Sequence, residues 1–220
     1  MNKYSLLISF IILLFNMNGF AITNKPTYSL DEQNAHHIHV LKLNPEEYQM
    51  ELVSGHDSVF GREFLADIVK RKNADIGINA GFFEIAGNDD GMPCGALFID
   101  GKFYGMQSKN LPCIIKKGSK VEIKNLQPSL AIFIGNNEFK INRFNKYINN
   151  KQTYLYNDSW GKSTLSNYNT RTEIIISSDN KLLEISSHGD SKIPDGGYVI
   201  SLPGNYKLPK MQVGDKVTFK

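Results

Sequence analysis

Cysteine, tryptophan and clustered charge are all scarce in this sequence of 220 residues. It has two cysteines and one tryptophan, and two cysteines are too few for a small fold that depends on disulfides. Lys and Arg number 25 against 22 Asp and Glu, for a formal net charge of +3, and no long basic run occurs. The charge pattern therefore gives no support for nucleic-acid binding.

Motifs for nucleotides, cofactors and metals are also missing. The sequence has neither GxxxxGK[ST] nor GxGxxG, and it lacks the GxSxG motif of serine hydrolases. His37 and His39 would share one face of a strand, but no carboxylate or thiol is placed to complete a metal site. We therefore expect no cofactor and no metal.

The bulk composition is that of a globular protein. Hydrophobic residues make up 41% and charged residues 21%, with 18 Gly and 8 Pro. These values exclude a disordered, collagen-like or coiled-coil chain as the main structure. The length suits one domain, or at most two small ones.

Residues 1–21 have the layout of a signal peptide. Lys3 gives the positive start, residues 5–15 form an uncharged apolar run, and Gly19 and Ala21 precede the cleavage point. The run is short for a membrane span, and an uncleaved anchor helix is the alternative. Cleavage after Ala21 predicts an exported protein, periplasmic or secreted, with no membrane segment left in it.

The rest of the chain, residues 22–220, predicts a single α+β domain with a mixed or antiparallel β-sheet rich in hairpins. One helix is expected over residues 62–72, where apolar residues recur at helical spacing. Residues 22–33 are expected to be a loose lead-in, and residues 76–78 a short buried strand. Further strands are predicted over residues 37–43, 48–53, 96–99, 103–104, 113–116, 121–123, 130–134, 139–141, 153–156, 172–176, 182–185 and 198–202.

Export would place Cys94 and Cys113 in an oxidising compartment, where two cysteines can pair. A disulfide between them is predicted, because the segment that separates them has the pattern of a hairpin. The alternatives are two buried free thiols, or a reactive Cys94 in a glycine-rich loop.

The sharpest motif is INAGFF at residues 78–83, followed by a glycine-rich loop and GMPCGALF at residues 91–98. A strand that ends in Asn79 and Gly81 presents an amide and bare backbone N–H groups to an anionic or polyhydroxy ligand. Phe83, like its neighbour Phe82, offers an apolar face to a sugar ring. Substrate-binding residues are thus predicted at Asn79, Gly81, Phe83 and Gly95. The blander interpretation is a tight turn that needs Gly81, with both phenylalanines in the core.

Three carboxylates lie in the same loop, at Glu84, Asp89 and Asp90. Sugar transfer needs carboxylates that protonate a leaving oxygen or stabilise an oxocarbenium-like centre. We therefore predict these three as catalytic residues, with Glu84 as the first candidate for the acid/base.

Taken together, these stretches resemble the phosphodiester glycosidase domain, found in the enzyme that uncovers mannose 6-phosphate tags and in secreted bacterial proteins. The resemblance is sharpest over residues 78–83 and 91–102, and it continues over residues 153–164, 172–176 and 193–201. It implies hydrolysis of a sugar-1-phosphodiester in a glycan or a cell-envelope substrate. The alternative is a non-catalytic, degenerate member of the family that binds glycans.

Members of that family usually continue beyond the point where this sequence ends, with an Asp-Gly-Gly segment thought to belong to the site. Residues 195–197 read Asp-Gly-Gly but belong to the middle of the resemblance, so they do not replace that segment. The resemblance therefore implies a domain truncated at its C-terminus. Besides the sugar phosphodiester or glycan, the partner it suggests is a separately encoded C-terminal half.

Overall fold

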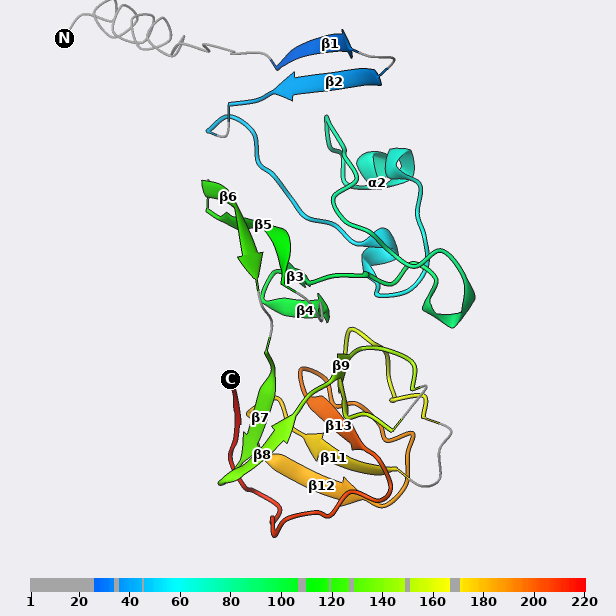
Figure 1. Cartoon of the computed structure of the whole chain (residues 1–220), viewed down its shortest axis with the longest axis vertical. Helices are drawn as coiled ribbons and strands as arrows, with labels where there is room; N and C mark the ends of the chain where they lie inside the picture. The colour runs from blue at the N-terminus through cyan, green and yellow to red at the C-terminus, as the bar shows by residue number, and fades with distance from the viewer. Residues whose placement is uncertain are drawn as a thin grey trace, which may run out of the picture. The chain divides into compact units, whose positions relative to one another are not determined.

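The computed structural model describes residues 26–33, 36–44, 46–106, 110–118, 120–126, 129–148, 151–166 and 171–220. The predicted signal peptide lies outside these residues. The chain divides into two compact units, one of residues 1–50 with 116–120 and the other of residues 51–115 with 121–220 (Figure 1). No helix among the described residues is long and apolar enough to cross a membrane. A single domain over residues 22–220 stays a prediction.

The first unit contains an antiparallel hairpin of β1 (Thr27–Gln33) and β2 (His36–Lys42). Tyr28 on β1 stacks on His39 of β2, and its hydroxyl lies 2.6 Å from the His39 Nδ1 atom. The expectation of a loose lead-in was therefore wrong for residues 27–33, while residues 22–25 lie outside the described residues. Strand β1 is defined by its pairing with β2, which its own polar composition does not reveal.

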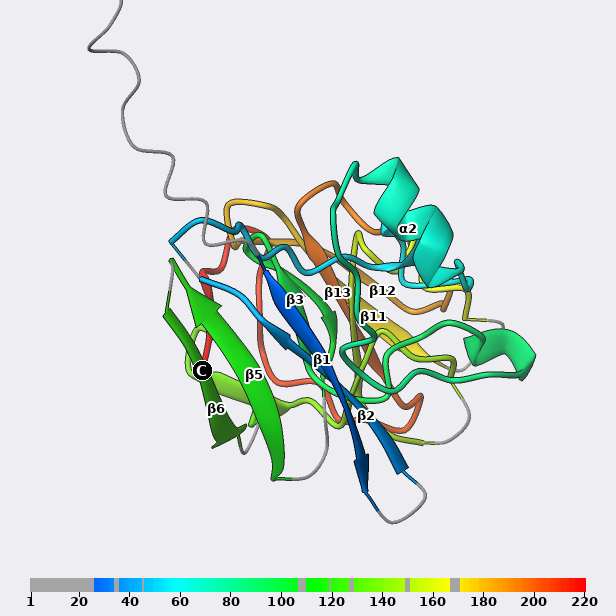
Figure 2. The ribbon, with the colours of Figure 1, turned by 90° about the horizontal axis from the view of Figure 1, so that it is seen from above.

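The second unit is built around a five-stranded sheet with the order β12-β11-β13-β10-β9. Figure 2 shows β12, β11 and β13 side by side. All neighbours are antiparallel except β9 and β10, which are parallel. The strands are β9 (Arg143–Phe144), β10 (Tyr154–Asn157), β11 (Thr172–Ile176), β12 (Leu182–Ser186) and β13 (Tyr198–Leu202).

A three-stranded antiparallel sheet, in the order β14-β7-β8, shares the main core with one face of this sheet. Its strands are β7 (Ala131–Ile134), β8 (Asn137–Lys140) and β14 (Val217–Phe219). Alternate residues of β7 are fully buried, as expected for a strand with one face toward the core. Strands β10, β11 and β13 are buried on both faces, so they form the centre of the unit.

The other face of the five-stranded sheet carries an aromatic cluster around Trp160. The Trp160 ring lies 4.8 Å from Phe60, 4.9 Å from Tyr147 and 5.2 Å from Tyr156, measured between ring centroids. Met92, which is only 1% exposed, packs into the same cluster. Phe60 and Met92, which lie outside the sheet, are thereby anchored to it.

The remaining elements are short. They comprise the hairpin of β3 (Leu97–Ile99) and β4 (Lys102–Gly105), the hairpin of β5 (Leu111–Lys117) and β6 (Lys120–Leu126), the 3-10 helices η1 (Gly55–Asp57) and η2 (Gly87–Asp89), and the helix α2 (Leu65–Arg71). Helix α2 confirms the helix predicted over residues 62–72 and is the single α-helix of the described part of the chain. The predicted α+β, sheet-rich fold class is confirmed.

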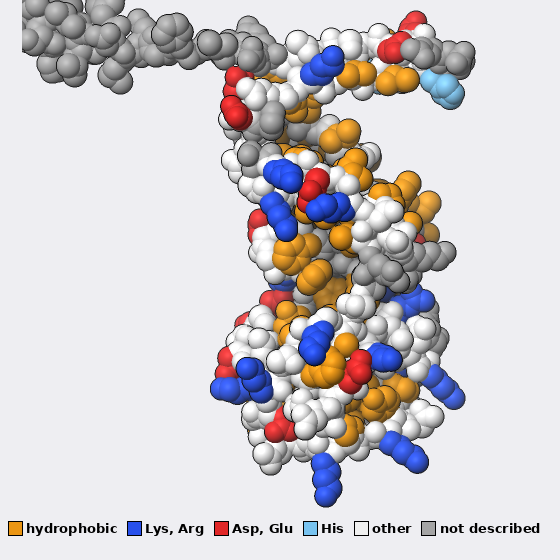
Figure 3. All heavy atoms as spheres, turned by 60° about the vertical axis from the view of Figure 1, so that its left-hand side comes forward, with side chains coloured by type: hydrophobic (Ala, Val, Ile, Leu, Met, Phe, Trp, Pro, Cys, Tyr) orange, Lys and Arg blue, Asp and Glu red, His pale blue; other side chains and the backbone are white. Residues whose placement is uncertain are grey.

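Two predicted strands are not formed. Residues 48–53 and 76–78 have no strand assignment, and Ile78 is highly exposed. A strand needs a hydrogen-bonded neighbour, and the described residues provide none at residues 76–78. Gly77 instead lies against α2, where a Cβ atom would come within 2.4 Å of the Val69 Cγ2 atom. Hydrophobic side chains also reach the surface at several other places (Figure 3).

Candidate functional site

The loop that follows INAGFF folds back on itself as a short ladder. The Cys94 N–H donates to the Phe82 carbonyl at 2.9 Å, and the Glu84 N–H donates to the Met92 carbonyl at 2.9 Å. The Gly91 N–H closes the loop by donating to the Glu84 carbonyl at 2.8 Å. These bonds fix the backbone of Glu84 and bring Cys94 next to it.

Two glycines hold this loop against the preceding segment. Gly91 has a φ of +85°, and a Cβ atom there would lie 2.1 Å from the Gly61 carbonyl oxygen. The Gly61 N–H donates to the Asp90 carbonyl at 3.0 Å. Two backbones cross here at a distance that only glycine permits, while buried Met92 secures the loop on the other side.

Beside this ladder lies a small cavity of about 120 Å³, lined by Glu84, Cys94, Met106, Asn142, Arg143, Phe144 and Lys146. At roughly 30 Å³ for each water, it has room for about four waters. Two cations and one carboxylate line it, so its formal charge is +2 − 1 = +1. A cavity of this size and charge suits a small anionic group.

Lys146 contributes the most distinctive group of the cavity. Its Nζ atom lies 3.8 Å from the Glu84 Oε1 atom, beyond hydrogen-bond distance. The Nζ atom is itself buried and has no hydrogen-bond partner. An ammonium has three donors, so this one is available to an anion that enters the cavity.

The backbone corner that carries Lys146 is fixed by a buried amide network. Asn145 is fully buried with a φ of +45°. Its Nδ2 atom donates to the Asn157 Oδ1 atom at 2.8 Å and to the Ser159 hydroxyl at 2.9 Å. The Asn157 N–H in turn donates to the Asn145 Oδ1 atom at 3.1 Å. Strand β10 and the turn after it therefore determine where Lys146 stands.

Strand β10 also places the other polar groups of the cavity. Arg143 on β9 pairs with Tyr154 of β10, and its Nε atom donates to the Gln152 side chain at 3.0 Å. Asn142 accepts a hydrogen bond of 3.0 Å from the Thr153 N–H through its side chain. Arg143 and Asn142 thus lie beside the cavity through their contacts with the start of β10.

The two cysteines are free thiols, so the predicted disulfide is not formed. Burial and the neighbouring Glu84 carboxylate raise the pKa of Cys94. Cys113 lies on β5, where its thiol donates a long 3.8 Å contact to the Leu111 carbonyl. The two side chains are engaged in separate environments. A raised pKa also disfavours the thiolate that a reactive Cys94 would need.

The other two predicted carboxylates do not line the cavity. Asp90 is paired with Arg62, whose Nε atom lies 2.9 Å from the Asp90 Oδ1 atom. Asp89 lies in η2, and its Oδ1 atom is buried without a hydrogen-bond partner. Of the three predicted catalytic residues, the fold brings only Glu84 to this cavity.

The predicted substrate-binding residues also lie outside the cavity lining. Asn79 and Gly81 are exposed, Phe83 bridges to Pro93, and Gly95 is half-buried. Nothing lies within 4 Å of a Cβ atom built on Gly81, so packing does not require a glycine there. Phe82 is 90% exposed, which contradicts the interpretation that both phenylalanines are core residues.

Sequence reasoning missed Lys146, Arg143 and Asn142. The only local signal was the polar turn that follows β10, which contains Asn157 and Ser159 and holds the Lys146 corner in place. No spacing rule connects this turn to the Glu84 loop, because the two meet only through the sheet.

Two buried charges elsewhere are fully used in structural hydrogen bonds. Glu173 accepts from the Thr164 hydroxyl at 2.9 Å and from the Ser191 N–H at 2.7 Å. Arg171 donates to the Ser201 hydroxyl and carbonyl at 2.8 and 2.7 Å. Burial of a charge is tolerated when it is paired in this way, so both residues stabilise the sheet.

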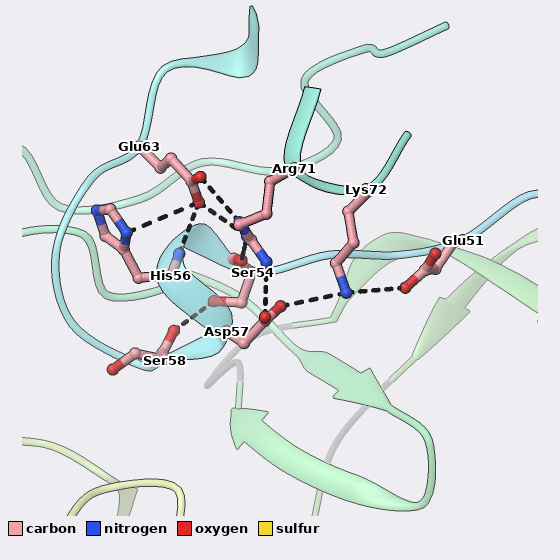
Figure 4. A network of polar contacts seen from close by, with 8 residues as sticks. All are labelled: Glu51, Ser54, His56, Asp57, Ser58, Glu63, Arg71 and Lys72. Carbon is pink, nitrogen blue, oxygen red and sulfur yellow. Dashed lines mark hydrogen bonds and ion pairs between the residues drawn. The ribbon is translucent and has the colours of Figure 1, made fainter. Parts of the chain in front are cut away.

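An ion-pair network joins α2 to η1 (Figure 4). Arg71 lies 2.8 Å from a Glu63 oxygen and 2.6 Å from Asp57. The hydrogen bond from Arg71, followed by one from the His56 N–H, lowers the pKa of Glu63 to about 2. Each carboxylate of the network is paired with Arg71 or Lys72, so the network holds the helix in place.

A wider cleft of about 460 Å³ lies beside β12 and includes Glu184, Asp190 and Lys192. Asp190 already accepts a 2.7 Å hydrogen bond from the Ser163 hydroxyl.

The described residues contain no group of three or more His, Cys, Asp or Glu side chains that would hold a metal ion. The Glu84 cavity therefore remains the best candidate site.

Comparison with known proteins shows a shared fold. No protein-family model matches this chain. It is 35% identical over 150 residues to an uncharacterized protein of Rickettsia conorii, which covers 67% of this chain and 53% of the relative. The chain thus spans about half the length of the curated relative it matches.

Two crystal structures have the same fold. A hypothetical protein from Synechocystis matches with a TM-score of 0.70 and 18% identity, over 89% of this chain and 38% of that one. A protein named "Putative exported protein" from Burkholderia pseudomallei K96243 matches with a TM-score of 0.64 and 15% identity, over 83% of this chain and 45% of that one.

Proposed function

We propose that this protein is an exported phosphodiester glycosidase-like hydrolase that cleaves a sugar-1-phosphodiester of a glycan or a cell-envelope substrate. The observation that carries the proposal is the Glu84 carboxylate, which shares a small cavity with the Arg143 guanidinium and with the Lys146 ammonium, which has no hydrogen-bond partner. The resemblance over residues 78–83 and 91–102 supports the substrate class. The layout of residues 1–21 and the fold shared with an exported-protein structure support export.

In the proposed reaction, water attacks the anomeric carbon and the bond from that carbon to the phosphate oxygen breaks. The hydroxyl of water stays on the sugar, and its proton passes to Glu84 or the departing phosphate monoester. Lys146 and Arg143 hold phosphate oxygens, because charge-assisted hydrogen bonds stabilise the charge that develops on the leaving group. Glu84 serves as the acid/base.

Hydrolysis of a glycosidic bond usually needs two carboxylates, and in the described residues Glu84 is the only carboxylate that lines this cavity. We therefore propose that the chain alone is a poor enzyme and that a separately encoded C-terminal half completes the site. The single carboxylate also favours the alternative function, a degenerate member that binds the glycan phosphodiester without cleaving it.

The test uses the purified protein with an aryl sugar-1-phosphodiester and with a nucleotide sugar. Calorimetry should detect binding, and Lys146→Met should weaken it at least tenfold, because it removes the available donor. Glu84→Gln should keep binding but abolish any hydrolysis seen when the second polypeptide is present. Glu138→Gln, at an exposed side chain of β8, is the control.

Unchanged binding in Lys146→Met would contradict the proposed site. Binding without hydrolysis, even in the completed assembly, would favour the glycan-binding alternative.

A further inference from the structure

The backbone hydrogen-bonding groups of residues 75–81 are unpaired. None of their N–H or C=O groups takes part in a hydrogen bond, whereas the Ala74 N–H donates to the Val69 carbonyl and the Phe82 carbonyl accepts from Cys94. Residues 76–80 have no helix, strand or turn assignment. Seven consecutive residues thus lie unpaired between two well-bonded segments, and two of them, Ile76 and Ile78, favour strands.

The apolar side chains of the same region are also uncovered. Phe82 is 90% exposed, Ile78 84%, Phe64 82% and Ile85 70%. These are four of the six most exposed large hydrophobic side chains in the described part of the chain. Exposed apolar side chains that gather into a patch mark sites of association, and Ile78 and Phe82 lie within or next to residues 75–81.

The segment is nonetheless supported from one side. Gly77 lies against Val69 and Leu65 of α2, at a distance too short for any side chain at residue 77. Helix α2 is tied to η1 by the ion pairs of Arg71 (Figure 4). One side of the segment is therefore held in place, while its backbone and the Ile78 side chain remain available.

An unpaired backbone next to exposed apolar side chains is what a sheet edge offers to an added strand. The lengths of the matched proteins indicate the source of such an added strand. The matched region makes up 53% of the Rickettsia relative and 38% and 45% of the two crystallised chains. In each of them, a part of comparable or greater length lies outside the matched region.

We infer that residues 75–81 accept a β-strand from a segment that corresponds to a part of these longer relatives outside the matched region. Its backbone pairs with residues 75–81, and its apolar side chains cover Ile78 and Phe82. This docking rests on hydrogen bonding and exposure and does not depend on the proposed hydrolysis. It also specifies where the proposed C-terminal half would bind.

Hydrogen exchange tests the inference. The purified protein is measured alone and with the unmatched remainder of the Rickettsia conorii relative, expressed as a separate polypeptide. Amides of residues 76–81 should exchange without protection in the protein alone and at least tenfold more slowly in the complex. Ile78→Asp and Phe82→Asp should abolish the complex in size-exclusion chromatography.

Ile123→Asp and Val213→Asp are matched controls, because these side chains are 72% and 71% exposed and lie elsewhere. Both should leave the complex intact. Glu84→Gln should also bind normally, which separates failure of docking from failure of catalysis.

Absence of a complex, or a complex that survives Ile78→Asp, would overturn the inference. Protection of residues 76–81 in the isolated monomer would do the same. Protection that increases with protein concentration, together with a dimer, would assign the edge to a second copy of this chain instead.

Discussion

The hydroxyl of Tyr156 donates a hydrogen bond of 2.7 Å to the backbone carbonyl of Lys146. A side chain from the centre of the sheet thereby fixes the residue that supplies the ammonium of the cavity. Burial is the main cause that raises the pKa of Tyr156 far above its usual range. The hydroxyl therefore remains a donor at every physiological pH.

Replacement of Tyr156 by Phe should lower the free energy of unfolding by ~1 kcal/mol or more, because the Lys146 carbonyl loses its donor. It should also weaken binding of a sugar phosphodiester, since Lys146 is no longer held in place. Urea denaturation and calorimetry measure the two effects. Tyr206→Phe, at a partly exposed ring, is the control. Equal effects of both substitutions would show that the hydrogen bond has no special role.

Met92→Ala should destabilise the protein by about 2–5 kcal/mol, because it leaves a cavity in the aromatic cluster. The same change should loosen the Glu84 loop, whose N–H donates to the Met92 carbonyl. Faster exchange of the Glu84 and Cys94 amides would report this loosening. Met50→Ala, at an exposed side chain, should change neither quantity. A loss below ~1 kcal/mol for Met92→Ala would contradict the anchoring role.

Stability should depend on Glu63 in acid. Its pKa is lowered from 4.5 to about 2 in the folded protein, chiefly by the hydrogen bond from Arg71. A lowered pKa contributes stability that is present above pH 4.5 and is lost as the pH falls toward 2. Glu63→Gln should flatten this part of the pH profile in denaturation experiments between pH 2 and 5. An unchanged slope in the variant would refute the assignment.

Cys94 should react slowly for an exposed thiol. Burial and Glu84 raise its pKa, and only the thiolate attacks a disulfide reagent. Reaction with such a reagent at pH 8 should therefore become faster in Glu84→Gln, where the pKa of Cys94 falls. Two thiols should titrate in the native, unreduced protein. Fewer than two would restore the disulfide between Cys94 and Cys113.

The sequence could predict elements whose pairing is local. The β3–β4 hairpin joins two predicted strands through Asp100-Gly101, a sequence that favours a tight turn, and both residues take the positive φ that this turn needs. Strand β1 was misjudged although its partner β2 is local, with Gln33 paired to His36, because its polar composition gives no strand signal. Residues 76–78 were misjudged because they lack a hydrogen-bonded neighbour among the described residues. Lys146 was missed for a related reason: it reaches Glu84 only through the pairing of β9 with β10.

The backbone crossing at Gly61 and Gly91 couples the Glu84 loop mechanically to residues 59–61. Phe60 lies within this segment, and its ring is 4.8 Å from the ring of Trp160. A ligand that displaces the Glu84 loop therefore moves an aromatic neighbour of the only tryptophan in the chain. The intrinsic fluorescence of Trp160 should therefore change when a ligand occupies the cavity, without any added label.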